Sequence, residues 1–194
     1  MRAGFPLTPD VVARYFTGRR PADMFTEVEI AARRKLPPNF AEIVASVILR
    51  RFRKELRATR HACSGLALKV ILETGELRDD ATIERAAHLA LAEGADFLKT
   101  STGKTPIGAT PQAAAAMLRA IAADAAATHR VGFKASGGIR TVAAAMPYID
   151  AVERQLGAQA LTPARFRIGA SSLLDDIEAV LAGAAAAPTS NDRY

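Results

Sequence analysis

From residue 66 onward, short apolar runs alternate with longer alanine-rich stretches in which apolar residues recur with the period of a helix. The short runs contain β-branched, leucine and aromatic residues, which is typical of buried strands. They lie at residues 66–73, 95–99, 131–134 and 166–169. The alternation predicts β/α units in which each strand is followed by a helix and the strands form a parallel sheet.

Helix boundaries are marked by residues that favour them. Helices are predicted over residues 81–93, from 111 onward, over 141–156 and over 173–183. Their expected capping residues are Asp79 or Asp80, Thr110, Thr141, and Ser171 or Ser172. Pro111 fits the first position of its helix, and Gly94 and Gly157 fit helix ends.

The first 60 residues follow this pattern less closely. Residues 26–30 have the pattern of a short strand, residues 40–62 that of one long helix, and residues 4–6 could end a strand. This adds up to about five complete strands, whereas an eight-stranded barrel typically needs roughly 250 residues. We therefore expect an α/β fold of the (β/α)8 TIM-barrel type, incomplete and lacking about the first two to three strands.

Three parts are expected along the chain. Residues 1–60 would hold the remnant of a third strand, a fourth strand and a basic helix. Residues 61–182 would form a half-barrel with the catalytic motifs, and residues 183–194 a flexible tail.

Composition narrows the class of protein. Apolar residues make up 49% and charged residues 24% of the 194, as in ordinary soluble domains. No apolar run reaches the roughly 18 residues of a membrane span, so no membrane partner is expected. The lone Cys63 cannot pair within the chain, which favours a reducing, cytoplasmic location.

Positive charge is concentrated in the first 60 residues, which carry 13 Lys/Arg and 6 Asp/Glu. Much of it lies between Arg50 and Arg60. Such a cluster can bind nucleic acid, but few aromatic residues lie nearby to stack on bases. A solvated helix face is therefore favoured, and a nucleic-acid-binding module is the weakest of the interpretations.

Lysines stand at the ends of two predicted strands, where a β/α barrel carries its chemistry. Lys99 ends the second of the four runs and Lys134 the third. A like charge nearby lowers the pKa of a lysine, and a neutral amine can attack a carbonyl. Schiff-base chemistry and simple pairing with an anion are about equally favoured. Lys69 is a third candidate, and an ion pair with Glu73 or with another acid that lines the barrel is an equally favoured alternative.

Glycine- and serine-rich loops follow the last two predicted strands. Gly137 and Gly138 follow one, and Gly169, Ser171 and Ser172 end or follow the other. Glycine lets backbone N–H groups approach a phosphate, and a helix N-terminus adds its dipole. The loops therefore predict a phosphate site. The three histidines show no metal-ligand spacing, so no metal is expected.

As a set, these segments resemble deoxyribose-phosphate aldolase, a family of class I aldolases. The resemblance covers about residues 60–180 and is carried by LKVILETGEL at 68–77, GADFLKTSTGK at 94–104, GFKASGGIR at 132–140 and FRIGASSLL at 166–174. It implies a lyase that reversibly cleaves 2-deoxy-D-ribose 5-phosphate to glyceraldehyde 3-phosphate and acetaldehyde in deoxyribonucleotide and carbohydrate catabolism. It also implies that neither a metal nor another cofactor is used.

The resemblance assigns roles residue by residue. Lys99 matches the Schiff-base lysine, Lys134 the second lysine that lowers the first one's pKa, and Lys69 an auxiliary lysine. The substrate- and phosphate-binding positions fall on Thr102, Gly103, Lys104, Gly137, Gly138, Gly169, Ser171 and Ser172.

The front of the chain departs from the family pattern. The family's proton relay uses an aspartate in a strand of the type E-V-D, where this chain has Glu29, one methylene longer. A displacement of about 1 Å at a catalytic group can cost around 10²-fold in rate. The terminal Tyr194 resembles the C-terminal tyrosine of some members, although a frayed tail is favoured.

Two alternatives to an active enzyme stay open. One is a truncated, catalytically impaired member that only binds phosphorylated ligands, and the other is the basic nucleic-acid-binding module. Whether two chains pair as a homodimer is also left open by the sequence.

Overall fold

The computed structural model describes residues 29, 35, 40–77 and 79–183. Residues 1–52 and residues 53–194 form two compact units. Helix α3 (Phe40–Ala62) is the long helix that the sequence predicts, and it crosses the boundary between the units. All of the strands described below belong to the second unit.

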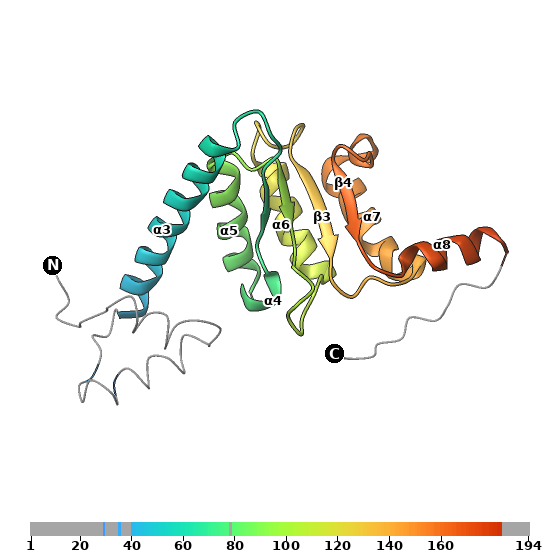
Figure 1. Cartoon of the computed structure of the whole chain (residues 1–194), viewed down its shortest axis with the longest axis horizontal. Helices are drawn as coiled ribbons and strands as arrows, with labels where there is room; N and C mark the ends of the chain where they lie inside the picture. Colours follow the sequence, from blue (N-terminus) through green and yellow to red (C-terminus); the bar gives the residue numbers. More distant parts are fainter. Residues whose placement is uncertain (1–28, 30–34, 36–39, 78, 184–194) are drawn as a thin grey trace. The chain divides into compact units, whose positions relative to one another are not determined.

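The second unit is built on a parallel sheet of four strands in the order β1-β2-β3-β4 (Figure 1). The strands are β1 (Lys69–Ile71), β2 (Phe97–Lys99), β3 (Gly132–Ser136) and β4 (Phe166–Gly169). The helices are α4 (Thr74–Leu77), α5 (Asp80–Ala92), α6 (Pro111–Ala123), α7 (Val142–Leu156), the 3-10 helix η1 (Ala158–Ala160) and α8 (Leu173–Leu181). Consecutive parallel neighbours joined through helices are the arrangement of a β/α barrel.

The hydrophobic core lies between the sheet and its helices. Leu98 of β2 and Phe133 of β3 are fully buried, as are Met117, Leu118 and Ile121 of α6. Because side chains alternate along a strand, the residues next to Leu98 in β2 and next to Phe133 in β3 point to the opposite face of the sheet. Apolar residues therefore cover the helix side of the sheet, and the other side carries the charged residues Lys69, Lys99, Lys134 and Arg167.

Three helices begin where the sequence predicts. Asp79, Thr110 and Thr141 each accept a hydrogen bond from the backbone N–H three residues later, at 2.8, 3.1 and 3.1 Å. These caps satisfy N–H groups that a helix start otherwise leaves unpaired. Ser172 takes the N-cap position of α8, but its side chain makes no capping hydrogen bond.

Several boundaries differ from the predictions. Strand β1 has three residues where eight were predicted, and β3 continues to Ser136, two residues beyond the predicted end. Thr74 begins the short helix α4, although Thr74-Gly75 reads as a breaker. The described residues hold four strands. Of the strand predicted at residues 26–30, only Glu29 is described, and it is helical. The predicted strand end at residues 4–6 and the tail from residue 184 lie outside the described residues.

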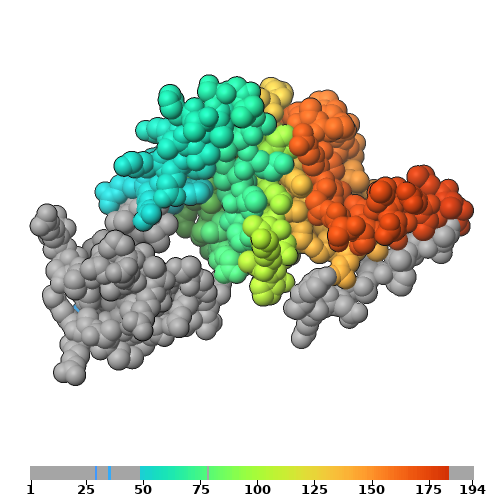
Figure 2. Space-filling model, viewed as in Figure 1, coloured from blue at the N-terminus to red at the C-terminus, as the bar shows by residue number. Residues whose placement is uncertain are grey.

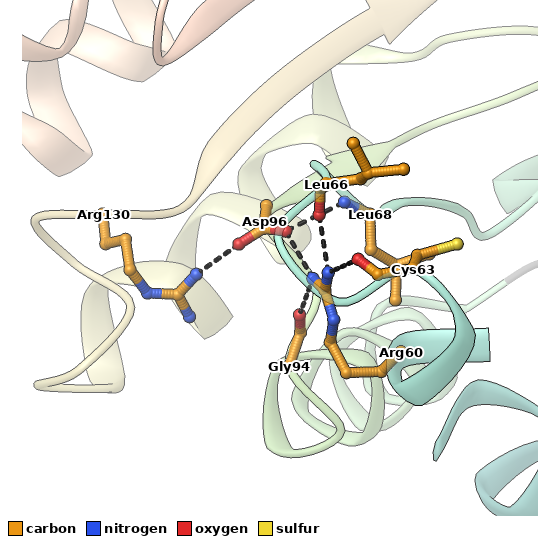
Figure 3. A network of polar contacts seen from close by, with 7 residues as sticks. All are labelled: Arg60, Cys63, Leu66, Leu68, Gly94, Asp96 and Arg130. Carbon is orange, nitrogen blue, oxygen red and sulfur yellow. Dashed lines mark hydrogen bonds and ion pairs between the residues drawn. The ribbon is translucent and has the colours of Figure 1, made fainter. Parts of the chain in front are cut away.

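A polar network ties the end of α3 to the start of the sheet (Figure 3). Arg60 donates to the Asp96 carboxylate at 2.6 Å and to the backbone carbonyls of Gly94, Cys63 and Leu66. Asp96 also accepts from the backbone N–H of Leu68 at 2.8 Å and from Arg130 at 2.8 Å. The strands β1 and β2 are thereby anchored at their N-terminal ends.

The basic helix is therefore only partly the solvated face that its charge pattern indicates. Arg57 binds the buried carboxylate of Glu93 at 2.9 Å, and Arg53 lies 3.5 Å from it. Arg60 is engaged with Asp96. Within the described ranges, no helix combines the length and apolar character that crossing a membrane requires.

Candidate functional site

A row of cations crosses the face of the sheet that points away from the core. Lys99 of β2 is the register partner of Lys134 of β3, and Lys134 is the partner of Arg167 of β4. Neighbouring strands are about 4.8 Å apart, and register partners point to the same face. The strand ends thus bring together the two lysines that the sequence singled out, with an arginine beside them.

Burial and repulsion both act on Lys134. Burial is the largest cause that lowers its pKa from 10.5, followed by the charges of Lys69, Lys99 and Arg167. Its side chain runs past Gly169, where a Cβ atom would lie 2.7 Å from Cε and 3.3 Å from Nζ. Glycine at 169 therefore leaves the space that the amine occupies.

An aromatic ring stands between two of these cations. The Lys69 ammonium lies 5.6 Å and the Arg167 guanidinium 4.6 Å from the centre of the Phe97 ring. Both distances fit cation–π contacts. A Cβ atom on Gly132 would come within 2.3 Å of that ring, so Gly132 makes room for it.

A cavity of about 660 Å³ opens at the C-terminal ends of the strands. Eight predicted site residues line it: Lys99, Thr102, Gly103, Lys104, Gly137, Gly138, Gly169 and Ser171. Lys134, Lys69 and Ser172 are not in its wall. The catalytic candidate Lys99 and the predicted phosphate loops therefore share one cavity, and Lys134 stands behind Gly169.

The loops around the cavity need glycine. Gly137 and Gly138 have φ values of 98° and 84°, which side chains disfavour. A Cβ atom on Gly108 would lie 2.5 Å from the Gly137 carbonyl oxygen, and the N–H of Ala109 donates to that oxygen at 3.0 Å. The start of α8 has no side-chain cap, so its N–H groups can face an anion.

Hydroxyl groups below the cavity join β2 to β3. The Thr100 hydroxyl donates to the Ser136 carbonyl at 3.0 Å and accepts from the Ser136 N–H at 3.0 Å. Ser136 donates in turn to the Ser101 carbonyl at 2.5 Å. All three residues are buried, so the strand ends carrying the two lysines are held firmly together.

The roles predicted for the site residues stay predictions, and two of these residues, Glu29 and Tyr194, are not part of the described second unit. Glu29 belongs to the first unit and makes a 2.9 Å ion pair with Lys35, and its proton-relay role stays a prediction. Tyr194 lies outside the described residues. The alternative for Lys69 was an ion pair with Glu73, but the Glu73 carboxylate accepts from Thr102 and Thr105 instead.

Sequence reasoning missed Arg167, Phe97 and the contacts of Glu73. Alternation along FRIG places Arg167 on the face of Gly169, and this signal could have found it. No local pattern indicates the partners of Glu73. Within the described part of the chain, no three His, Cys, Asp or Glu residues lie grouped as metal ligands.

The chain is similar in sequence to known aldolases. The family model of the DeoC/LacD family aldolases matches residues 49–179. A curated deoxyribose-phosphate aldolase of Agrobacterium fabrum (strain C58) is 50% identical over 129 residues, 66% of this chain and 49% of the relative. The chain thus spans about half the length of that relative.

Solved structures agree on the fold. A Toxoplasma gondii ME49 structure assigned as a deoxyribose-phosphate aldolase matches with a TM-score of 0.61 and 25% identity, over 69% of this chain and 52% of that one. A Coccidioides immitis structure with the same assignment matches with a TM-score of 0.54 and 29% identity, over 66% and 45%. These neighbours are TIM barrels, and the four-stranded sheet corresponds to part of one.

Proposed function

Because the chain belongs to the DeoC/LacD family of aldolases, we propose that it cleaves 2-deoxy-D-ribose 5-phosphate to glyceraldehyde 3-phosphate and acetaldehyde. The reaction is reversible and passes through a Schiff base on Lys99. The observation that carries the proposal is the position of Lys99, in the cavity wall and in register with Lys134.

The first step is attack of a neutral amine on the substrate aldehyde. Burial and the charges of Lys69, Lys99 and Arg167 lower the pKa of Lys134, so this cluster disfavours an additional positive charge and suits an amine nucleophile. The Lys99 nitrogen adds to the aldehyde carbon, and loss of water leaves a protonated imine. Lys134 then acts as the neighbouring cation and Lys69 as an auxiliary one.

The protonated imine serves as the electron sink for cleavage. The hydroxyl group on carbon 3 gives its proton to water, the bond between carbons 2 and 3 breaks, and its electron pair forms an enamine. Glyceraldehyde 3-phosphate leaves. Protonation of the enamine carbon and addition of water then release acetaldehyde and restore the amine.

The phosphate group fits the loops on the other side of the cavity. Gly137, Gly138 and Ser171 offer backbone or hydroxyl groups, and Lys104 offers a charge. A phosphate near the uncapped start of α8 would also gain from the helix dipole.

Covalent trapping tests this proposal. Borohydride is added with 2-deoxy-D-ribose 5-phosphate, and the adduct is located by intact mass and peptide mapping. We expect an adduct on Lys99 that is lost in Lys99→Ala and kept in Lys54→Ala, which changes an exposed lysine of α3. An adduct on Lys134 instead would overturn the assignment of the nucleophile.

A second candidate is a chain that binds phosphorylated ligands without turnover. It is favoured by the exposure of the sheet face that carries Lys99, where Ile71 of β1 is 40% exposed. Phosphate binding without any borohydride adduct, in protein shown to be folded, would select it.

Two finer expectations accompany the proposal. The lone Cys63, which is free in the structure, is consistent with a reducing compartment such as the cytoplasm. Pairing of two chains as a homodimer is decided by light scattering at several protein concentrations.

A further inference from the structure

The loop between β2 and α6 carries three of the proposed substrate-binding residues, and little of it is buried. Thr102, Gly103 and Lys104 are exposed, and the segment that follows β2, yellow-green in Figure 2, stands out from the surface. Burial of apolar surface cannot hold such a segment, so its position depends on specific contacts.

Glu73 makes those contacts with the first half of the loop. Its carboxylate accepts hydrogen bonds from the Thr102 N–H at 3.1 and 3.2 Å and from the Thr102 hydroxyl at 2.6 Å. It also accepts from the Thr105 hydroxyl at 3.1 Å. One carboxylate thus serves three donors on both sides of Gly103 and Lys104.

The backbone of Glu73 is itself unusual. Its φ of 51° is the only positive value of a non-glycine residue in the described ranges. A side chain in this region costs conformational energy and persists where the surroundings determine it. The turn after β1 is therefore held in a disfavoured conformation that aims the carboxylate at the loop.

The second half of the loop is held differently. A Cβ atom on Gly75 would lie 2.5 Å from the Ile107 carbonyl oxygen, and Gly108 lies close to Gly137. The Tyr148 hydroxyl donates to the Ala109 carbonyl at 2.9 Å. Backbone packing therefore fixes residues 107–109. Thr102 depends on Glu73, and the Thr105 hydroxyl can donate to Glu73 or to the Ile107 carbonyl, each at 3.1 Å.

We infer that Glu73 is a positioning residue that holds the segment of residues 102–105 in its substrate-binding conformation at the Lys99 cavity. The inference rests on the proposed function for what the segment binds. Glu73 does not line the cavity, so it acts through Thr102 and Thr105. Its loss should weaken binding of the phosphorylated substrate and leave the bond-breaking steps largely unchanged.

Hydrogen exchange without substrate tests the contact directly. We expect peptides covering residues 102–105 to exchange faster in Glu73→Ala than in the wild type, with peptides of β3 and α6 unchanged. Glu73→Gln keeps one oxygen acceptor and should lie between the two. Glu153→Gln, on the exposed surface of α7, is the matched control and should exchange like the wild type.

Glu73→Gly separates the carboxylate from the backbone strain. Glycine accepts a φ of 51° without penalty, so this variant relaxes the turn while removing the acceptor. If the carboxylate holds the loop, Glu73→Gly should behave like Glu73→Ala. Wild-type exchange in Glu73→Gly would assign the effect to the backbone and overturn the inference.

Kinetics supply a second readout. We expect KM to rise on the order of tenfold in Glu73→Ala with kcat nearly unchanged, because hydrogen bonds to a charged acceptor are lost. Thr105→Val alone should give part of this rise in KM. Added to Glu73→Ala, it should raise KM little further. A fall in kcat with constant KM would contradict a positioning role.

The two proposals fail in different ways. Absence of Lys99 trapping in the wild type contradicts the aldolase proposal, and the exchange experiment still decides whether Glu73 holds the loop. Wild-type exchange at residues 102–105 in Glu73→Ala contradicts the inference, whatever the enzyme activity.

Discussion

Lys134 carries its charge in surroundings that disfavour it. It is half-buried, and three other cations, Lys69, Lys99 and Arg167, lie near enough to lower its pKa below 10.5. No carboxylate is among the causes of the shift. Groups with such perturbed pKa values concentrate at functional sites, where stability is given up for chemistry.

Lys134→Met should therefore stabilise the folded chain at neutral pH, by about 1 kcal/mol, a usual size for one site. A lysine with a lowered folded-state pKa binds fewer protons folded than unfolded, so wild-type stability rises as the pH approaches 10.5 from below. Lys134→Met lacks this rise, so the stability by which it exceeds the wild type should become smaller as the pH approaches 10.5.

Urea denaturation at about pH 7 and about two units higher measures the difference. Lys54→Met changes an exposed lysine of α3 and should shift stability little at either pH. A Lys134→Met protein that is less stable than the wild type at neutral pH would contradict the repulsion argument.

Between elements, Asp96 is the junction of α3, β1 and β2. Burial raises its pKa, but the Leu68 N–H and the guanidinium groups of Arg60 and Arg130 outweigh that effect, so its pKa is lowered from 3.8. A carboxylate with a lowered pKa stabilises the fold above its unfolded-state pKa. That contribution is lost as the pH falls through the folded-state value.

Asp96→Asn should cost about 2–3 kcal/mol at neutral pH, because two guanidinium groups lose a charged acceptor. The cost should diminish as the pH falls from the unfolded-state value of 3.8 through the lower folded-state pKa, where the wild-type carboxylate becomes protonated. Denaturant melts across this pH range measure it, with the exposed Asp150→Asn of α7 as control. A cost that is independent of pH would refute the charge-based account.

The helices differ in how far the sheet buries them. Leu118 of α6 is fully buried, whereas α8 has no buried residue and its Leu174 is 63% exposed. Leu118→Ala should cost about 3 kcal/mol through lost burial and a cavity, and Leu174→Ala less than about 0.5 kcal/mol. Thermal melts compare the two. Equal costs would mean that the apolar face of α8 is covered in solution.

At the scale of the second unit, the described helices pack on one face of the sheet, and the opposite face, here called the open face, is not covered by any described helix. Lys69, Lys99, Lys134 and Arg167 come from four different strands and gather on the open face. The solved structures that the chain resembles are TIM barrels, in which that face lines the barrel interior. Such a basic face suits a phosphorylated ligand.

Inorganic phosphate should therefore raise the melting temperature by several degrees more than chloride at equal ionic strength. Binding to the folded state alone adds about 2.7 kcal/mol at a hundred times Kd. Lys104→Met, in the cavity wall, should reduce the shift, and Lys54→Met should not. Thermal melts in the two salts measure it.

Phosphate stabilisation that survives in Lys104→Met but disappears in Lys54→Met would move the anion site to α3. The nucleic-acid-binding interpretation would then gain support. It predicts that the logarithm of the affinity for oligonucleotides falls linearly with the logarithm of the salt concentration.

Local patterns in the sequence were sufficient for the order of strands and helices in the second unit. The helix starts at Thr110 and Thr141 depend on neighbours three residues away, and the strand FRIG depends on its own apolar run. The lengths of β1 and β3 were predicted less well, because strand ends depend on pairing with another strand.

The sequence by itself determined the β/α pattern, the two strand-end lysines and the glycine-rich loops, because each is written in consecutive residues. Only the tertiary structure decided that Arg167 stands beside Lys134, that Arg60 meets Asp96, and that Glu73 holds Thr102 and Thr105. These partners are about 30 or more residues apart in the chain. Strand register and loop packing bring them together, and no local periodicity encodes either.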